Sequence, residues 1–207
     1  MSPVKPRKIS RREQADASRH KVLAAARDAF IDSGYHGATM SDIARRAGLA
    51  VQTVSYFFGT KPKLMSQLLT TSVREAAPVG QAEWEQGMAA AEDAAALLDS
   101  VVEIGHQIMH QVSPLMDVAR IGGLTDPEVE EVYRFHEDWR RADFARFVAD
   151  LDRLHGLRPG LTVATATDVV LTVFGPESYL SFSVRCGWSG DQIKAWMHDA
   201  LRRLLLP

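Results

Sequence analysis

The stretch from Thr39 to Lys61 constrains the fold of this 207-residue chain most strongly. Thr39 can cap a helix, and Asp42 three residues later can complete a capping box. Gly48 can adopt the left-handed conformation that ends a helix, and a second short helix then fits Val51 to Phe58. Two helices joined this tightly predict a helix-turn-helix, whose second helix enters the major groove of DNA.

Helical geometry separates the two sides of this second helix. At about 100° per residue, Val51, Val54 and Phe58 share one stripe, which we expect to pack against other helices. The opposite face carries side chains that can bind bases or phosphates. Its members are Gln52, Thr53 and Tyr56, with Ser55 and Phe57 on the flanks. The two-helix pattern alone is equally compatible with a buried helical hairpin in another all-α protein.

A longer pattern of residues at fixed spacing favours the DNA-binding interpretation. It comprises Val22-Leu23-Ala24-Ala25-Ala26, Phe30, Gly34-Tyr35, Gly37, Thr39, Asp42-Ile43-Ala44, Ala47-Gly48, Gln52-Thr53-Val54, Phe58, Lys61 and Leu64. With these residues, the chain from about Val22 to Leu69 resembles the tetracycline-repressor (TetR) family of bacterial transcription regulators. The resemblance implies a DNA face and places Lys61 beside a phosphate. The residues of this face are Thr39, Gln52, Thr53, Ser55, Tyr56, Phe57 and Lys61.

Three positions depart from the family's pattern. The family usually has a tyrosine where Ser55 stands, often a histidine where Phe57 stands, and commonly a serine or threonine cap where Ala50 stands. Tyr56 can supply the missing phenol. The departures therefore concern the affinity and the individual contacts, while the resemblance still implies binding to double-stranded operator DNA.

Charge is distributed unevenly along the chain. Residues 1–77 carry 13 Lys and Arg against 6 Asp and Glu, a net charge of +7. The remainder carries 11 Lys and Arg against 20 Asp and Glu, a net charge of −9. A chain with one basic end is expected to bind a polyanion with that end and not over its whole surface.

Composition limits the compartment and the chemistry. The hydrophobic content of 46% is ordinary for a soluble globular chain. There is no apolar run of about eighteen residues and no hydrophobic signal region, so we expect a cytoplasmic protein without membrane contact. The single cysteine, Cys186, cannot form an intrachain disulfide. We expect it to be structural, with redox sensing as the alternative.

The periodicity of apolar residues predicts an all-α protein of two domains. Residues 1–77 should form a three-helix helix-turn-helix domain, with 1–9 as a disordered basic arm that either stays solvated or contacts DNA. Residues 78–207 should form a second helical domain, and the resemblance implies that it is an effector-binding and dimerisation domain. Its helices are predicted at 91–112, 115–121, 126–154, 163–184 and 189–205, with the 163–184 helix kinked but not ended by Gly175-Pro176.

The end of the chain predicts a homodimer. Gly175-Pro176-Glu177-Ser178-Tyr179, followed by Gly187-Trp188-Ser189 and a last amphipathic helix, resembles the ending of TetR-family effector domains. The resemblance implies that the last two helices pair with their copies in a second subunit. These helices are also apolar on more than one face, which leaves surface for a partner. The predicted interface residues are Trp188, Trp196, Leu201, Leu204 and Leu205.

The resemblance also implies a small-molecule effector that binds between the middle helices. The predicted lining residues are Trp84, His106, Met109, His110, Met116, Phe135, Trp139, Phe174 and Tyr179. Their apolar character predicts an apolar effector, although each residue alone also fits an ordinary core. Glu103, His106 and His110 share one helix face, but a fourth metal ligand is not in reach by sequence. We therefore predict no metal and no cofactor.

These features bear on three classes of function. A ligand-gated repressor explains the helix-turn-helix, the charge asymmetry and the all-α body, with the helix beginning at Lys61 as the link between ligand and DNA. A constitutive or architectural dimeric DNA-binding protein without an effector is the alternative. An enzyme is not predicted, because no Gly-x-Ser-x-Gly motif, phosphate-binding loop or zinc signature is present.

Overall fold

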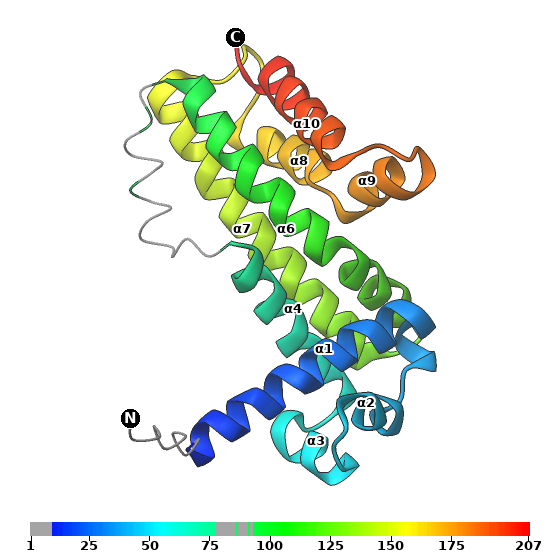
Figure 1. The fold of residues 1–207 in the computed structure, drawn as a ribbon. Helices are drawn as coiled ribbons and strands as arrows, with labels where there is room; N and C mark the ends of the chain where they lie inside the picture. Colours follow the sequence, from blue (N-terminus) through cyan, green and yellow to red (C-terminus); the bar gives the residue numbers. More distant parts are fainter. Residues whose placement is uncertain (1–9, 78–85, 87–90, 92) are drawn as a thin grey trace, which may run out of the picture. The chain divides into compact units, whose positions relative to one another are not determined.

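The computed structural model describes residues 10–77, 86, 91 and 93–207, and its regular elements over these residues are all helical (Figure 1). The predicted all-α class is confirmed. Contacts divide the chain into two compact units, Met1–Leu68 and Leu69–Pro207. The division falls within α4 (Lys61–Ala76), so one continuous helix contributes to both units. The sequence-based boundary at 77/78 stays a prediction, and the basic arm 1–9 lies outside the described residues.

The first unit contains α1 (Arg11–Gly37), α2 (Met40–Ala47) and α3 (Val51–Phe58). Ser10 and Glu13 form a capping box at the start of α1. Gly34 has a φ of 69° and interrupts the helical geometry within α1. The core of the unit consists of fully buried apolar side chains from all of its helices. They include Val22, Ala26, Phe30, Ile43, Val54 and Leu64.

The second unit is built on two long helices, α6 (Ala94–Gly123) and α7 (Pro127–His155), which lie side by side (Figure 1). They are followed by α8 (Val163–Val173), α9 (Pro176–Leu180), a π-helical turn at Ser181–Arg185 and α10 (Gly190–Leu205). Helix α8 packs on α7, and α9 and α10 pack on α6. The shared core includes Leu98, Met109, Phe147, Val170, Phe174, Met197 and Leu201.

Two predicted helix boundaries are wrong. Ser113-Pro114 does not end a helix, because α6 continues through Pro114 to Gly123. Proline removes one backbone hydrogen bond, yet Val112, Leu115 and Met116 remain buried on both sides of it. Packing of these apolar side chains holds the helix together across the gap.

Gly175-Pro176 ends α8 where a kink was predicted. Phe174 leaves helical geometry at φ −88° and ψ 19°, and Pro176 begins α9, a position where its missing N–H costs nothing. The hydroxyl of Ser178 donates to the carbonyl oxygen of Thr172 at 2.7 Å. This hydrogen bond satisfies a carbonyl at the end of α8 and stabilises the corner between the two helices.

None of the helices in the described part of the chain combines the length and the apolar character that a membrane crossing requires.

Candidate nucleic-acid interface

Helix α2 is fixed at its start by a cap and along its length by ion pairs. The hydroxyl oxygen of Thr39 accepts the N–H of Asp42 at 3.1 Å. The predicted capping box is not formed, because the Asp42 carboxylate accepts hydrogen bonds from Arg45 and from Arg46, the latter at 2.7 Å. These bonds lower the pKa of Asp42. Arg46 also pairs with Asp32 of α1 at 2.6 Å, so both α2 arginines have carboxylate partners.

The turn and the second helix follow the predicted geometry. Gly48 adopts the left-handed conformation, with φ 67° and ψ 34°. Helix α3 then begins at Val51 and ends at Phe58, before Gly59 at a φ of 74°. Gly48 thereby re-aims the chain within two residues, as a helix-turn-helix requires.

The two faces of α3 are clearly separated. Val54 and Phe58 are buried, at 0% and 3% exposure. On the other side Tyr56 is 85% exposed, and Gln52 and Ser55 are also exposed. A phenol and an amide held on one face of a short helix are the donors and acceptors that can meet phosphates and base edges.

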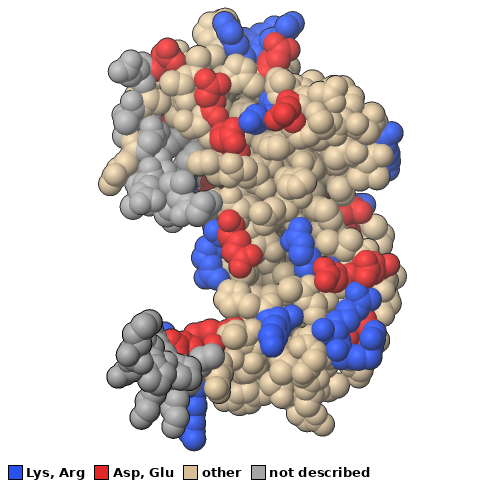
Figure 2. Space-filling view, viewed as in Figure 1, with Lys and Arg blue, Asp and Glu red and all other residues tan. Residues whose placement is uncertain are grey.

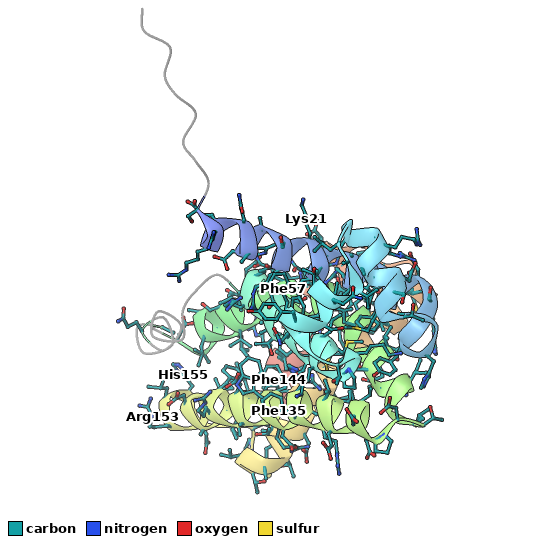
Figure 3. The ribbon with its side chains drawn as sticks, turned by 90° about the horizontal axis from the view of Figure 1, so that it is seen from below. Lys21, Phe57, Phe135, Phe144, Arg153 and His155 are labelled. Carbon is teal, nitrogen blue, oxygen red and sulfur yellow. The ribbon has the colours of Figure 1, made fainter. Side chains whose placement is uncertain are left out.

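Thr53 and Phe57 are half-buried at the margins of this exposed face. The ring of Phe57 lies under the guanidinium carbon of Arg19, a residue of α1, at 5.1 Å. Figure 3 shows Phe57 on the side of α3 that faces α1. Of the predicted DNA face, the structure therefore brings Gln52, Ser55 and Tyr56 together as its open centre.

Lys61 occupies a more internal position than the sequence predicts. Its ammonium group donates to the carbonyl oxygens of Tyr35 at 2.8 Å and Ala38 at 3.1 Å. It also lies 4.1 Å from the centre of the Tyr35 ring. These contacts tie the start of α4 to the end of α1, so Lys61 has a structural role besides any contact with DNA.

Replacing Lys61 with alanine should therefore have two effects. Loss of the two charge-assisted hydrogen bonds should lower the free energy of unfolding by about 1.5–3 kcal/mol. If the ammonium also meets a phosphate, the slope of log affinity against log salt should flatten by about one per subunit for all DNA sequences. Urea denaturation and binding isotherms at several salt concentrations measure the two effects separately. A stable variant with unchanged binding would contradict both assignments.

The predicted effector-lining residues do not surround one cavity. Met109, Met116, Phe174 and Tyr179 are buried in the packed interior of the second unit. Trp84 lies outside the described residues. Two aromatic residues of α7 lie outside this interior, because Phe135 is 62% and Trp139 48% exposed, and their role in ligand binding stays a prediction. Phe135 and Trp139 lie on the accessible side of α7, and Figure 3 shows Phe135 on this helix.

His106, His110 and Tyr179 do form a cluster between α6 and α9. His110 Nδ1 and the Tyr179 hydroxyl are 3.0 Å apart, and the His106 ring centre lies 5.8 Å from the Tyr179 ring centre. Burial, with a contribution from nearby Lys194, lowers the pKa of His106. Burial raises the pKa of Tyr179. Both shifts favour the uncharged forms of His106 and Tyr179.

The arrangement of acidic and histidine side chains does not suggest a metal site. Among the described residues, no group of three or more His, Cys, Asp or Glu side chains has the spacing to hold a metal ion. Glu103 instead forms an ion pair with Lys194 of α10 at 3.0 Å.

A polar pocket of about 500 Å³ opens between α7, α8 and α9. Most of its lining residues carry carboxylate, guanidinium or hydroxyl groups. The lining consists of Glu137, Asp138, Arg140, Arg141, Asp168, Leu171, Thr172, Gly175, Glu177 and Ser178. Arg140 donates to the carbonyl oxygen of Phe174 at 2.8 Å and to Glu137 at 2.9 Å. Sequence reasoning missed these residues because it looked for apolar lining. The pair of acidic residues followed by a pair of arginines at 137–141 was the available signal.

The predicted dimer residues divide into buried and accessible ones. Leu201 and Leu205 are fully buried in the core of their own subunit, which leaves Leu204 as the accessible one of the three leucines. Trp188 and Trp196 are half-buried and pack on Phe182, with ring centres 4.5 and 4.4 Å away. Leu204 is 42% exposed. Figure 2 shows few charged groups over the α9 region of this unit.

Comparison with known proteins relates part of the chain to a family. Residues 22–68 match the model of the bacterial regulatory proteins of the tetR family. The matched segment is similar to the DNA-binding domain of that family and contains the whole of α2 and α3. This match supports a DNA-binding regulator.

Solved structures share the TetR fold over nearly the whole chain at low sequence identity. A putative TetR-family regulator from Rhodococcus sp. is 13% identical, with a TM-score of 0.72 and coverage of 92% of this chain and 99% of that one. NalD of Pseudomonas aeruginosa, the secondary repressor of the MexAB-OprM multidrug efflux pump, is 16% identical, with a TM-score of 0.69 and coverage of 93% and 98%. A putative regulator from Saccharomonospora viridis in complex with choline is 16% identical, with a TM-score of 0.69 and coverage of 93% and 99%.

Proposed function

We propose that this protein is a homodimeric repressor that releases its operator when a small molecule binds its second unit. The observation that carries the DNA-binding half of the proposal is the open face of α3, where Gln52 and the 85% exposed Tyr56 stand opposite the buried Val54. Gln52 can pair bidentately with adenine, and Tyr56 can donate to a phosphate. Thr39, Thr53 and Ser55 supply further hydroxyl groups nearby.

A second copy of the chain is the partner proposed for the end of the second unit. Val184 is 73% and Leu204 42% exposed, and Trp196 is half-buried. Exposed apolar side chains on the last helices are expected to be covered by their equivalents across a twofold axis. A twofold dimer presents two copies of α3, so its operator should be nearly palindromic, with half-sites one or more helical turns apart.

The effector is proposed to bind the pocket between α7, α8 and α9. The charged lining of this pocket favours a small polar molecule over the apolar effector predicted from the sequence. The choline complex of the Saccharomonospora viridis regulator supports the view that this fold can hold a small organic cation. NalD, named as a repressor, supports repression as the outcome of DNA binding.

A constitutive DNA-binding dimer is the second candidate. It is favoured by the close packing of Met109, Phe174 and Tyr179, which fill space that the sequence assigned to a ligand. The candidates differ in one observable. A repressor with an effector loses operator affinity when a compound occupies its second unit, and a constitutive protein does not.

Selection of bound duplexes from a random pool tests the DNA-binding half. We expect an enriched sequence with twofold symmetry. Replacing Gln52 with alanine should then cost about 1–3 kcal/mol of binding free energy and relax preference at one base position in each half-site.

The matched control for Gln52 is Gln14→Ala, which removes the same side chain from an exposed position on α1. Unchanged affinity and unchanged base preference in the Gln52 variant would remove this residue from the DNA face. Failure to enrich any sequence would contradict operator recognition as a whole.

A further inference from the structure

Arg19 of α1 lies against two aromatic rings of α3, the helix that carries the candidate DNA face. Its guanidinium carbon lies 5.1 Å from the centre of the Phe57 ring and 6.0 Å from the centre of the Phe58 ring. A guanidinium group at this distance over a ring face is attracted by the negative potential of the ring. The contact joins two helices of the first unit across more than thirty residues of sequence.

Arg19 differs from the arginines on α2 in its ion pairing. Arg45 and Arg46 are paired with Asp42, and Arg46 also with Asp32. Within residues 10–77, Arg19 forms no ion pair with a carboxylate, and its side chain is exposed. A cation without a carboxylate partner, on a unit with net positive charge, can release counterions when it meets a phosphate.

The ring contacts leave the side chain of Arg19 with hydrogen-bonding capacity. A guanidinium carries five N–H donors, and a ring centre 5.1 Å from its carbon does not occupy them all. Holding the group in place also reduces the rotamer entropy that a long side chain loses on binding. Arg19 is therefore prepared for a second, anionic partner.

Phe57 places this cation next to the DNA face of α3. The ring centres of Tyr56 and Phe57 are 5.7 Å apart, and Tyr56 is the most exposed aromatic residue of the helix. Phe57 thus lies beside both the exposed phenol of Tyr56 and the guanidinium of Arg19.

We propose that Arg19 binds a phosphate of the DNA backbone and that Phe57 holds it at the edge of the DNA face. The inference rests on the proposed DNA-binding function and adds a contact from α1 to it. The contact is independent of base sequence, because a phosphate carries no sequence information.

The test measures binding to a mixed-sequence duplex of about thirty base pairs, long enough for two half-sites, at several salt concentrations. Arg19→Ala should lower affinity about fivefold at physiological salt and flatten the slope of log affinity against log salt by about one per subunit. Phe57→Leu should lower affinity two- to fivefold, because it removes the ring face and leaves the charge. The double variant should bind no more weakly than Arg19→Ala, since both changes remove one contact.

Lys21→Ala is the matched control. Lys21 lies two residues further along α1, about 200° around the helix from Arg19, and Figure 3 shows it pointing away from α3. Lys21→Ala removes the same charge at a position away from α3, and therefore its salt slope should equal that of the wild type. Circular dichroism melting of each variant shows whether the fold persists.

Two outcomes separate this inference from the proposed function. If the wild type does not bind the duplex at low salt, the proposed function itself fails. If the wild type binds with a steep salt dependence and folded Arg19→Ala shows the same affinity and slope, only the role of Arg19 is overturned. Equal losses in Arg19→Ala and Lys21→Ala would also overturn it, because overall charge would then explain the effect.

Discussion

Replacing Leu201 with alanine should lower the free energy of unfolding by about 2–5 kcal/mol. Leu201 is fully buried and belongs to the same core cluster as Ile193, Met197 and Leu205 of α10. Removing its three terminal carbon atoms leaves a cavity among side chains that can collapse only partly. Urea denaturation at one fixed protein concentration measures the change, because the apparent stability of a dimer depends on concentration.

Leu204→Ala is the comparison that separates core from interface. It makes the same chemical change three residues further along α10, where the side chain is 42% exposed. We expect it to cost less than about 1 kcal/mol in the stability of the subunit, as is usual for accessible positions, and to weaken self-association in sedimentation. If Leu201→Ala instead dissociated the protein without lowering its stability, our placement of Leu201 in the core of its own subunit would be refuted.

The local elements were predictable because their signals are local. Ser10 with Glu13, Gly48, Asp126 before Pro127, and Ser189 with Gln192 each lie within one turn of the helix end that they mark. A side chain that caps a neighbouring N–H, or a glycine that supplies a left-handed residue, acts within a few residues of its own position. Such residues can be recognised without knowledge of the tertiary structure.

Boundaries at proline were not predictable, because their outcome depends on packing. Pro114 lies inside α6 and Pro176 begins α9, although both follow a small residue, Ser113 and Gly175. The buried side chains around Pro114 maintain one helix, whereas the hydrogen bond from Ser178 to Thr172 stabilises an end. Neither contact can be inferred from the proline and its immediate neighbours.

The same limit applies to the candidate sites. The polarity of α3 identified its open face, because an eight-residue helix with a buried stripe has one free side. The contact of Arg19 with Phe57 joins distant residues, so periodicity gave no sign of it. Aromatic residues on α7 resembled pocket lining, but Phe135 and Trp139 lie on its exposed side. Apolar character alone does not reveal whether a side chain faces the core, a ligand or a partner.

A compound that occupies the pocket between α7, α8 and α9 should weaken operator binding by about 5- to 150-fold. The pocket is built on a closely packed corner. Arg140 donates to the carbonyl oxygen of Phe174, and a Cβ atom added at Gly105 of α6 would lie only 2.5 Å from the Phe174 ring. Because this corner has no spare space, a ligand that moves α7 against α8 must also shift Phe174 or the α6 backbone.

Helix α4 is the element that we propose transmits such a shift to the DNA face. It is one continuous helix whose first residues belong to the first unit and whose last residues belong to the second. In a dimer, both copies of α3 must keep the spacing of successive major grooves, so a small change in their separation weakens both contacts together. Linkage then requires the operator to weaken binding of the compound by the same factor.

The coupling is measured by titrating the compound into free protein and into the protein–operator complex, with calorimetry for the compound and fluorescence anisotropy for DNA. Asp138→Arg reverses a charge in the pocket lining and should abolish both binding of a cationic compound and its effect on the operator. Glu131→Arg makes the same change at an exposed position of α7 outside the lining and should preserve both. Without compound, both variants should bind the operator as the wild type does. A compound that saturates the pocket without changing operator affinity would favour the constitutive DNA-binding protein, because a ligand with equal affinity for both states shifts neither.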